Sequence, residues 1–279
     1  MESSEFTRVS RAVWEAMARG WDDRHAYLEE RARPVAERML ERVALRAGET
    51  ILDLAAGTGV VGLAAAPAVS PGGRVIVSDF SPAMIDAAKR HAAALGLENV
   101  EFRVLDAERL DLPTDAVDAV LCRWGYMLMA DPGAALAETR RVLRPGGRLS
   151  CAVFAGAQQN PWAALPSGVL NQRGHMPAPQ SGAPGILALG DRARLEALFA
   201  QAGFTSLDVE EVAFTWTFDD VDDYWAFVND AAGALAMVIA RLDDDERAAV
   251  RAQVADGLAP FRDGGGIAMP ATSLVTTAS

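Results

Sequence analysis

Positive charge, cysteine and histidine are all scarce in this chain. Lys and Arg total 26 against 38 Asp and Glu, so the formal net charge is −12. Because binding to a nucleic-acid backbone relies on clustered Lys and Arg, we expect no nucleic-acid partner. The two cysteines, Cys122 and Cys151, each lie in a short apolar run without a second ligand-type residue at metal spacing. We predict two buried reduced thiols, no disulfide and no metal site.

Long apolar runs are missing as well. No stretch approaches the roughly 18 uninterrupted apolar residues of a membrane span. The N-terminal sequence MESSEFTRVSRAVWEAM opens with charge and has no apolar run of the kind found in a secretion signal. We therefore expect no membrane span and a cytoplasmic location.

Short β-branched runs alternate with Ala-rich helical stretches from residue 34 to about residue 155. This alternation is typical of repeated βα units around a parallel sheet with helices on both faces. With two later strands, it predicts an α/β, doubly wound, mostly parallel seven-stranded Rossmann-like sheet with helical cap segments. In the last strand, Pro270 is tolerable only near the start or at a sheet edge. The strands are expected at residues 50–55, 73–80, 99–107, 115–124, 144–154, 206–218 and 267–278.

The same pattern divides the chain into segments of one domain overall. Residues 1–33 are expected to form an N-terminal helical cap, and residues 34–155 the cofactor-binding core. Residues 156–190, rich in proline and glycine, break the alternation, and we interpret them as a lid excursion over the carboxyl edge of the sheet. Residues 191–279 are expected to complete the sheet, with a helical insertion at 219–262.

A glycine-rich stretch, ILDLAAGTGVVG, carries the spacing G-x-G-x-x-G at Gly57, Gly59 and Gly62. In the dinucleotide fingerprint an acidic residue about 20 positions on binds the ribose, and Asp79 stands 20 residues after Gly59. Asp53 fits a dinucleotide poorly, because its carboxylate would lie near the negative pyrophosphate. It favours a cofactor that carries an ammonium or sulfonium group and no phosphate. Gly62 is then expected to serve helix packing.

Four motifs in order resemble the class I S-adenosylmethionine-dependent methyltransferases over residues 48–154. They are ILDLAAGTG, VIVSDFSPAMI, VLDAERLDLP and ETRRVLRPGGRL. Any one of them is weak, but four at the right spacing make a strong signal. Ala55 replaces the first glycine of the family's D/E-x-G-x-G-x-G pattern, a variation associated with the ubiquinone and menaquinone methyltransferase-like branch. The resemblance implies S-adenosylmethionine as the cofactor.

The resemblance also implies roles for single residues. Asp53 should lie near the methionine amino group, and Asp79 should accept both ribose hydroxyls. Asp106 should meet the adenine edge, while Arg123 and Trp124 should flank the sulfonium and its methyl group. A plain turn-forming role stays open for Asp79 and Asp106, and a packing role for Trp124. The expected cofactor-binding residues are Asp53, Ala55, Gly57, Thr58, Gly59, Asp79, Phe80, Ser81, Asp106, Ala107, Arg123 and Trp124.

Candidates for catalysis and acceptor binding are fewer. Of three histidines, His25 and His175 lie in segments that could reach over the cofactor, and either could act as a general base. A solvated surface histidine is the alternative for each, and His91 is expected on an exposed helix face. Most of the tryptophans lie outside the five-strand core, where they could form an aromatic cap or simply pack on the sheet. The expected pocket residues are Trp21, Tyr27 and Tyr126.

These observations predict an enzyme that moves a methyl group to a small organic acceptor by in-line displacement. A phenol, a quinone-like compound or another natural-product-type molecule would suit such a site. One alternative is a NAD(P)-dependent oxidoreductase, although the chain has no Tyr-x-x-x-Lys or comparable proton-donor set. Another is a non-catalytic binding protein on the same fold. The sequence leaves open the acceptor, the methylated element (O, N, C or S), the use of a base and a homodimer.

Overall fold

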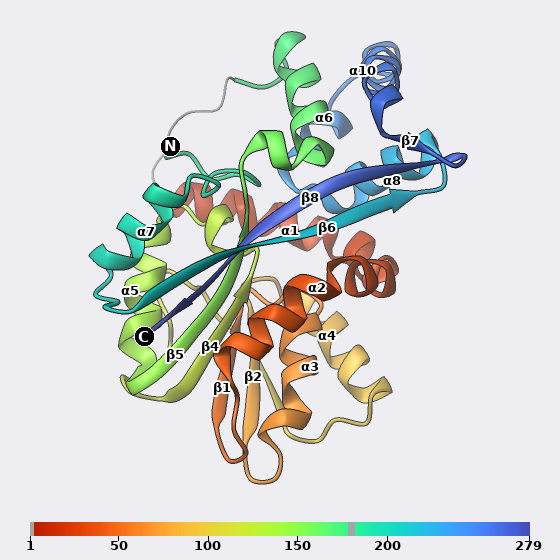
Figure 1. Ribbon diagram of the computed structural model, residues 1–279. Coiled ribbons are helices and arrows are strands. Elements are labelled where there is room, and N and C mark those ends of the chain that lie inside the picture. Colours follow the sequence, from red (N-terminus) through yellow and green to blue (C-terminus); the bar gives the residue numbers. More distant parts are fainter. Residues whose placement is uncertain (1–2, 178–181) are drawn as a thin grey trace.

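A single mixed sheet forms the frame of the molecule (Figure 1). The computed structural model describes residues 3–177 and 182–279. The strand order is β3-β2-β1-β4-β5-β8-β6, and β7 pairs with the start of β8. The strands are β1 (Thr50–Leu54), β2 (Arg74–Asp79), β3 (Val100–Val104), β4 (Val117–Arg123), β5 (Leu143–Phe154), β6 (Leu207–Phe218), β7 (Arg262–Asp263) and β8 (Gly266–Ala278).

Strands β1 to β5 form the parallel part of the sheet. Every residue of β1 is buried, so both faces of this strand are covered. Burial on both faces explains why the β1 sequence is an apolar run rather than an alternation of apolar and polar residues. The strand order reverses between β1 and β4, because β2 and β3 lie on one side of β1 and β5 lies beyond β4. In such sheets ligands bind outside the carboxyl ends of the two strands at this switch point.

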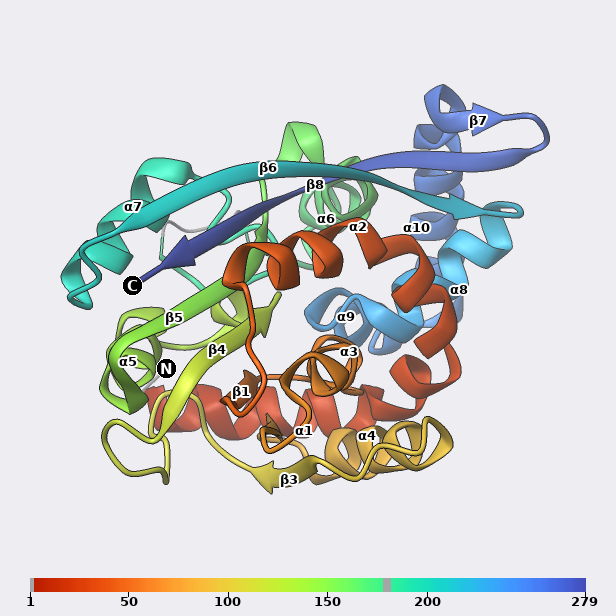
Figure 2. The ribbon, with the colours of Figure 1, turned by 60° about the horizontal axis from the view of Figure 1, so that its bottom comes forward.

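Strands β6 and β8 form an antiparallel part, in which two long strands run side by side (Figure 2). β8 lies between β5 and β6, but β5 pairs only with the β8 residues Ser273–Ala278. Pro270 therefore pairs with only one neighbouring strand, opposite Thr215 of β6. Its missing N–H interrupts no hydrogen bonds to β5, because β5 does not reach this part of β8. The predicted fold class is confirmed. The predicted seven strands become eight, because the two-residue strand β7 is too short to leave a periodic signal.

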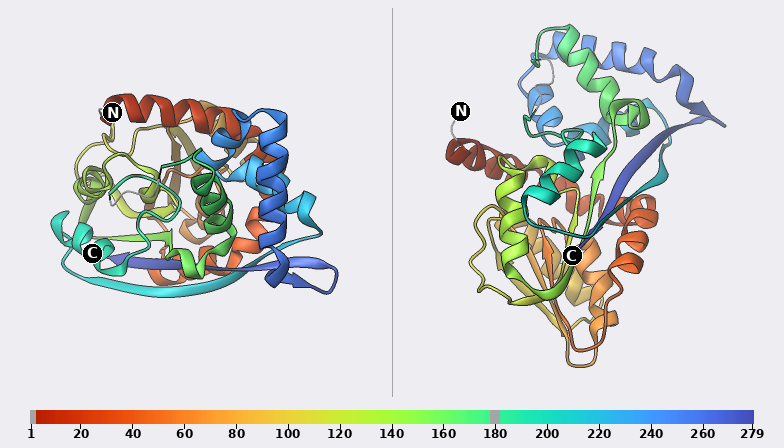
Figure 3. Two further views of the ribbon diagram at one scale, coloured as in Figure 1. Left: turned by 90° about the horizontal axis from the view of Figure 1, so that it is seen from above. Right: turned by 60° about the vertical axis from the view of Figure 1, so that its left-hand side comes forward.

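Helices cover both faces of the sheet. α2, α3 and α4 pack on one face and α5 and α7 on the other (Figure 3). The helices are α1 (Ser3–Asp23), α2 (His25–Val43), α3 (Val60–Val69), α4 (Pro82–Ala94), α5 (Pro132–Val142), α6 (Pro161–Gln172), α7 (Arg192–Gln201), α8 (Val221–Ala231), α9 (Ala234–Ala240) and α10 (Asp244–Gly257). Short 3-10 turns lie at Tyr126–Leu128, Ala157–Gln159 and Ala259–Phe261.

Two helices that follow core strands begin with a side-chain cap. Ser81 caps α4 by accepting a hydrogen bond from the Met84 N–H at 3.3 Å, and Asp131 caps α5 by accepting one from the Ala134 N–H at 2.9 Å. A proline in the first turn of each helix adds a preset φ angle where no N–H is needed.

The helices that do not cover the two faces of the sheet gather beyond the carboxyl ends of the parallel strands (Figures 1 and 3). α1 packs against α4 and α8, and α6 packs against α10 and β8. The expected lid excursion thus contains the regular helix α6, and its residues 178–181 lie outside the described part of the chain. The expected division into segments stays a prediction. Within residues 3–177 and 182–279, no helix is both long and apolar enough to span a bilayer.

Candidate functional site

The turn after β1 has an unusual backbone conformation. Gly57 and Gly59 have positive φ angles of 55° and 88°, a region that glycine adopts without strain, and Ala55 has a φ of 52°. The Ala56 N–H ties the loop to β2 by donating to the Ser78 carbonyl at 2.9 Å. The loop therefore reverses the chain from β1 into α3 at the carboxyl edge of the sheet.

Asp53 is buried near the end of β1, with 1% of its surface exposed. Its Oδ2 accepts a hydrogen bond from the Gly62 N–H at 2.7 Å. Burial raises the pKa of Asp53 to about 7, although the Gly62 hydrogen bond and the charge of Arg123 act in the opposite direction. A Cβ atom at Gly62 would lie 2.6 Å from the Asp53 Oδ2, so this glycine lets α3 pack closely on β1, the helix-packing role expected for it.

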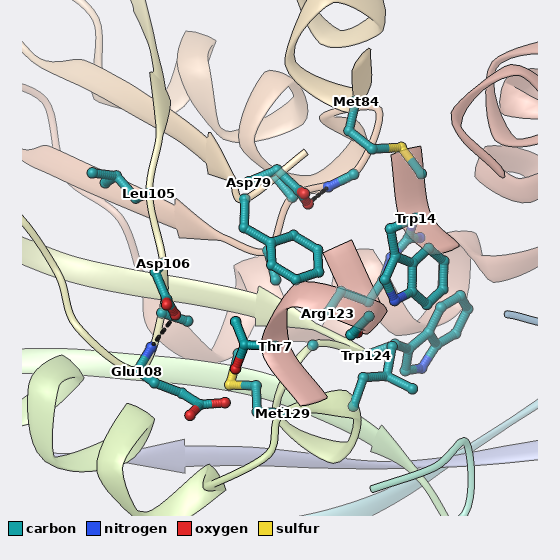
Figure 4. Close-up of a pocket in the computed structure, with 18 of the residues that line it drawn as sticks. Thr7, Trp14, Asp79, Met84, Leu105, Asp106, Glu108, Arg123, Trp124 and Met129 are labelled. Atoms are coloured by element: carbon teal, nitrogen blue, oxygen red, sulfur yellow. Dashed lines mark hydrogen bonds between the residues drawn. The ribbon is translucent and has the colours of Figure 1, made fainter. Parts of the chain in front are cut away.

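Asp79 ends β2 and shapes the same loop. Its Oδ2 accepts from the Gly57 N–H at 2.9 Å, a bond drawn in Figure 4, and its Oδ1 accepts from the Ser81 N–H at 2.9 Å. Burial raises the pKa of Asp79 to about 6, while these backbone hydrogen bonds lower it. Each carboxylate oxygen has two lone pairs, so Asp79 can also accept hydrogen bonds from ligand hydroxyls.

Ala55 and Gly125 fit together across the site. A Cβ atom at Gly125 would lie 2.8 Å from the Ala55 Cβ and 2.7 Å from the Cys122 Sγ. The Ala55 methyl group is therefore accommodated because residue 125 has no side chain. The residue before it, Trp124, has a φ of 60°, which is rare for a bulky side chain and turns the chain sharply after β4.

These residues face one cavity of about 960 Å³, counting its open mouth, at the carboxyl ends of β1, β2 and β4 (Figure 4). Helix α1 contributes one wall through Phe6, Thr7, Ser10, Trp14 and Trp21. The predicted cofactor residues that line it are Asp53, Ala55, Gly57, Asp79, Phe80, Asp106, Ala107, Arg123 and Trp124.

Arg123, at the end of β4, is the one cation among the described residues that line this cavity. Its Nη1 is buried without a protein partner, and its guanidinium carbon lies 4.7 Å from the Trp124 ring centre. Burial lowers the pKa of Arg123 to about 10, and the charges of Asp53 and Glu29 oppose this shift. The acidic lining residues are Asp53, Asp79, Asp106 and Glu108. This balance of charge favours a ligand with positive charge over a pyrophosphate.

Residues 51–147 match the family of methyltransferase domains. The chain is similar to a demethylmenaquinone methyltransferase of Thermus thermophilus, with 46% identity over 104 residues that cover 37% of this chain and 46% of that protein. It is also similar to the ubiquinone/menaquinone biosynthesis C-methyltransferase UbiE of Hahella chejuensis, with 34% identity over 117 residues, 42% of this chain and 47% of that protein. Each match thus spans about half the length of the relative.

The fold comparison agrees with the sequence match. The YcgJ protein of Bacillus subtilis superposes with a TM-score of 0.60 at 19% identity, covering 87% of this chain and 96% of that one. The core is a class I methyltransferase domain. The predicted family and its cofactor, S-adenosylmethionine, are therefore confirmed for this domain, whereas the roles of single residues stay predictions.

The cavity of the methyltransferase domain fits this cofactor on its own chemistry. A buried carboxylate such as Asp53 is least unfavourable beside a cation, and the cofactor's ammonium group would supply one. Asp79 has lone pairs for two ribose hydroxyls. The unpartnered Nη1 of Arg123 can donate a hydrogen bond to the cofactor or to the acceptor. Asp106 lines the cavity beyond β3, where its Oδ1 already accepts from the Glu108 N–H at 3.0 Å.

Three predicted cofactor residues shape the methyltransferase site without lining the cavity. Thr58 is 2% exposed, and its Oγ1 hydrogen bonds with the His25 Nδ1 at 2.8 Å. Gly59 supplies the turn at the start of α3. Ser81 caps α4, and its hydroxyl also hydrogen bonds with Glu15 of α1. Their hydrogen bonds and turn geometry hold the loop and α1 in place, and their contact with the cofactor stays a prediction.

Two of the three predicted pocket residues lie elsewhere. The Tyr126 ring is 1% exposed and its hydroxyl hydrogen bonds with the Thr139 Oγ1 at 2.6 Å, so it packs under α5 away from the cavity. The Tyr27 hydroxyl donates to the Thr217 carbonyl at 3.0 Å, behind the cavity wall. Only Trp21 lines the cavity, beside Gly57. Spacing predicts that such residues are buried, but it does not predict which side of a helix or turn faces a ligand.

The structure corrects the expectation for His91 and shows the surroundings of His25, whose role as a general base stays a prediction. His25 stacks on His91 with ring centres 3.6 Å apart, and the His91 Nε2 hydrogen bonds with the Asp22 Oδ1 at 2.7 Å. His91 is thus half-buried and paired, not on an exposed helix face. Burial, with the charges of His91 and Arg123, lowers the pKa of His25 to about 4. His25 lies behind the glycine loop and does not line the cavity.

His175 is also remote from the methyltransferase cavity. Its Nε2 hydrogen bonds with the Glu246 Oε1 at 2.6 Å, in a contact between the residues after α6 and the start of α10. It lines none of the cavities formed by the described residues near the glycine loop. His175 is partly buried, with 26% of its side chain exposed, and its role as a general base stays a prediction.

Sequence reasoning missed several lining residues. Phe6, Thr7 and Ser10 come from α1, whose apolar face carries no ligand signature in the sequence. Gly125 could have been found only from its close approach to Ala55, which depends on the fold. The other missed lining residues are Trp14, Ala56, Val61, Met84, Leu105, Glu108, Leu128, Met129 and Ala130.

Proposed function

We propose that the chain transfers a methyl group from S-adenosylmethionine to a small organic acceptor. The observation that carries this proposal is the pair of buried carboxylates, Asp53 and Asp79, at the switch point of the sheet. The cofactor, when bound, supplies an electrophilic methyl group whose bond to sulfur breaks as the bond to the acceptor forms. The chain's residues bind and orient the two reactants and exclude water.

The geometry supports a methyltransferase against the dinucleotide alternative. Gly62 completes the G-x-G-x-x-G spacing, yet its N–H donates to Asp53 and its Cα faces that carboxylate. It therefore has no N–H left for a pyrophosphate. The predominance of carboxylates around the cavity also disfavours a ligand with two phosphate groups.

The acceptor is best supported as an aromatic ring that carries oxygen atoms. Two relatives are named for the methylation of quinones or of their precursors, which supports a phenol or quinone-like acceptor. No histidine, lysine, cysteine or tyrosine is among the described residues that line the cofactor cavity. Any proton taken from the acceptor would therefore go to one of the lining carboxylates, Asp53, Asp79, Asp106 and Glu108, or to solvent. A cytoplasmic location and a homodimer stay predictions.

A screen for S-adenosylhomocysteine release tests this function. The purified protein is incubated with S-adenosylmethionine and single members of a panel of phenols, quinols, amines and thiols. We expect release that depends on a phenol or quinol, and we expect Asp79→Asn to reduce it at least tenfold by weakening ribose binding. Binding of the cofactor without transfer to any acceptor would contradict the proposal and favour a non-catalytic binding protein.

A further inference from the structure

A second, smaller cavity adjoins the cofactor cavity. It has a volume of about 430 Å³, counting its opening, and the two cavities share Trp14, Trp21, Trp124 and Leu128 as lining residues. The remaining lining residues come from α2, β5, α6, β6, α8 and the segments that follow β4, α6 and α8. They are Leu28, Met127, Phe154, Trp162, Ile186, Trp216, Phe227, Ala231, Ala232 and Gly233. We call this space the aromatic chamber.

The aromatic chamber has no charged side chain among its described lining residues. Its walls are rings in mutual contact. Trp124 stacks on Phe154 with ring centres 4.5 Å apart, and Trp162 meets Trp216 edge to face at 5.8 Å. Trp216 and Trp162 are 1% and 4% exposed. A flat apolar molecule fits such walls, whereas a charged molecule would lose its hydration without gaining a counter-ion.

Three tryptophans that line the aromatic chamber have unpaired hydrogen-bond donors. The indole N–H groups of Trp21, Trp162 and Trp216 are buried and have no hydrogen-bond partner among the described residues. Trp124 differs, because its N–H donates to the Ser273 Oγ at 3.0 Å. Buried indole N–H groups usually find a partner. Three unpartnered donors around one chamber therefore point to oxygen atoms of a ligand.

We infer that the aromatic chamber binds the methyl acceptor as an uncharged, flat ring system with hydrogen-bond-accepting oxygens, and that Trp162 and Trp216 donate to those oxygens. This inference rests on the proposed function. The shared wall of Trp124 and Leu128 places the acceptor next to Arg123 and Asp53. The reacting atom of the acceptor then lies at the junction of the two cavities.

The matched family segment does not contain the residues that carry this inference. It ends at residue 147, whereas Trp162, Trp216 and Phe227 follow it in the chain. The methyltransferase domain thus supplies the cofactor site, and the added segments supply the acceptor site. Selectivity for the acceptor is therefore a property of this chain's own α6, β6 and α8.

Equilibrium dialysis with three bicyclic probes tests the inference. Naphthalene has no oxygens, 1,4-naphthoquinone adds two uncharged carbonyl groups, and 1-naphthoate adds a negative charge. Both cysteines are buried, so the quinone has no exposed thiol to alkylate. We expect the quinone to bind about tenfold more tightly than naphthalene, the effect of one added buried hydrogen bond. We expect 1-naphthoate to bind more weakly than either.

Tryptophan-to-phenylalanine variants assign the donors. Trp162→Phe and Trp216→Phe keep a six-membered aromatic ring but remove the N–H and part of the apolar wall, so each should weaken quinone binding by roughly threefold to tenfold more than it weakens naphthalene binding. Trp225→Phe on α8 is the matched control, because Trp225 lines neither cavity, and it should change neither affinity. Thermal unfolding of each variant checks that the fold is kept.

The outcomes separate the two proposals. Three results would each overturn the inference. The wild-type protein could bind naphthalene and the quinone equally, or bind 1-naphthoate more tightly than either. The variants could lose the same affinity for both neutral probes. The wild-type comparison tests the inference even if a variant does not fold. Dialysis is performed with and without S-adenosylhomocysteine, whose own binding is measured on the same samples. If the probes bind as expected but S-adenosylhomocysteine does not bind, the result counts against the proposed function and not against the inference.

Discussion

Asp53 shows how one residue can change the interpretation of a motif. A pattern search on the glycine spacing passes over this position, because the dinucleotide fingerprint does not include it. The structure buries the Asp53 carboxylate with a single hydrogen-bond partner, the Gly62 N–H. The argument that a carboxylate at this position fits a pyrophosphate poorly was available from the sequence alone. Its burial and its raised pKa could be known only from the fold, because the helix α3 that covers it starts seven positions after it.

The pKa of Asp53 predicts how cofactor binding depends on pH. Burial raises this pKa to about 7 in the free protein, and a bound ammonium group would stabilise the ionised form. Binding below pH 7 must then release a proton, so the affinity falls by up to about tenfold per pH unit as the pH is lowered. Because the pKa of Asp79 is raised to about 6, the decline should steepen below that pH.

Calorimetric titration with S-adenosylhomocysteine from pH 7.5 to pH 5.5 measures this dependence. Asp53→Asn is the control, since an amide oxygen can still accept from the Gly62 N–H but carries no charge. It should bind about tenfold or more weakly at pH 7.5 and lose the pH dependence between pH 7.5 and pH 6. An affinity of the wild-type protein that does not change with pH would show that Asp53 has no charged partner in the complex.

The histidines lead to a second prediction at this scale. His25 and His175 line neither cavity, and the lowered pKa of His25 leaves it neutral at pH 7. Loss of a general base typically reduces the rate by 10²–10⁴, whereas we expect His25→Gln and His175→Gln each to reduce kcat by less than about threefold. His25→Gln should act on the KM for the cofactor, because His25 contacts the glycine loop at Thr58. A hundredfold fall in kcat for either variant would restore that histidine as a base.

Elements that follow local rules were predictable, and elements that depend on distant contacts were not. The strands β1, β2, β4 and β5 are apolar runs between turns, so the sequence places each to within a few residues. The position of β8 between β5 and β6 is different, because a strand near the C-terminus can join a sheet at several places. The covering of the cavity by α1 depends in part on the Glu15 contact with Ser81, more than 60 residues away, and leaves no local pattern.

The contact of α3 with β1 is the element-scale feature that is easiest to test. A Cβ atom at Gly62 would lie 2.6 Å from the Asp53 Oδ2 and 2.8 Å from its Cβ, both parts of a buried strand. Gly62→Ala should therefore push α3 from β1, destabilise the protein by about 1–3 kcal/mol and weaken cofactor binding. Urea unfolding measures the first effect and calorimetry the second.

Gly168 provides a matched control within another helix. It lies inside α6, and a Cβ atom there would meet nothing within 4 Å. Gly168→Ala should thus be neutral or stabilising by up to about 1 kcal/mol, since alanine is the better helix former. If Gly62→Ala proved as harmless as Gly168→Ala, the close packing of α3 on Asp53 would not be a constraint on the site.

At the scale of the whole molecule, the matched domain and the segments outside it meet at the carboxyl edge of the sheet. The matched domain, residues 51–147, supplies the glycine loop, Asp79, Asp106 and Arg123. Segments on both sides of it supply the rest of the walls, from α1, α6, β6 and α8. The first part was predictable because its motifs are short and ordered. The second was not, because aromatic residues spread over 200 positions come together only through packing.

Calorimetry with S-adenosylhomocysteine and with NAD, on the same preparation of the wild-type protein, tests the central claim most directly. The central claim is that the cavity between Asp53, Asp79 and Arg123 is a site for a cationic, phosphate-free nucleoside cofactor. The account predicts micromolar binding of one S-adenosylhomocysteine per chain and no detectable heat from NAD. Tight binding of NAD without binding of S-adenosylhomocysteine would contradict it.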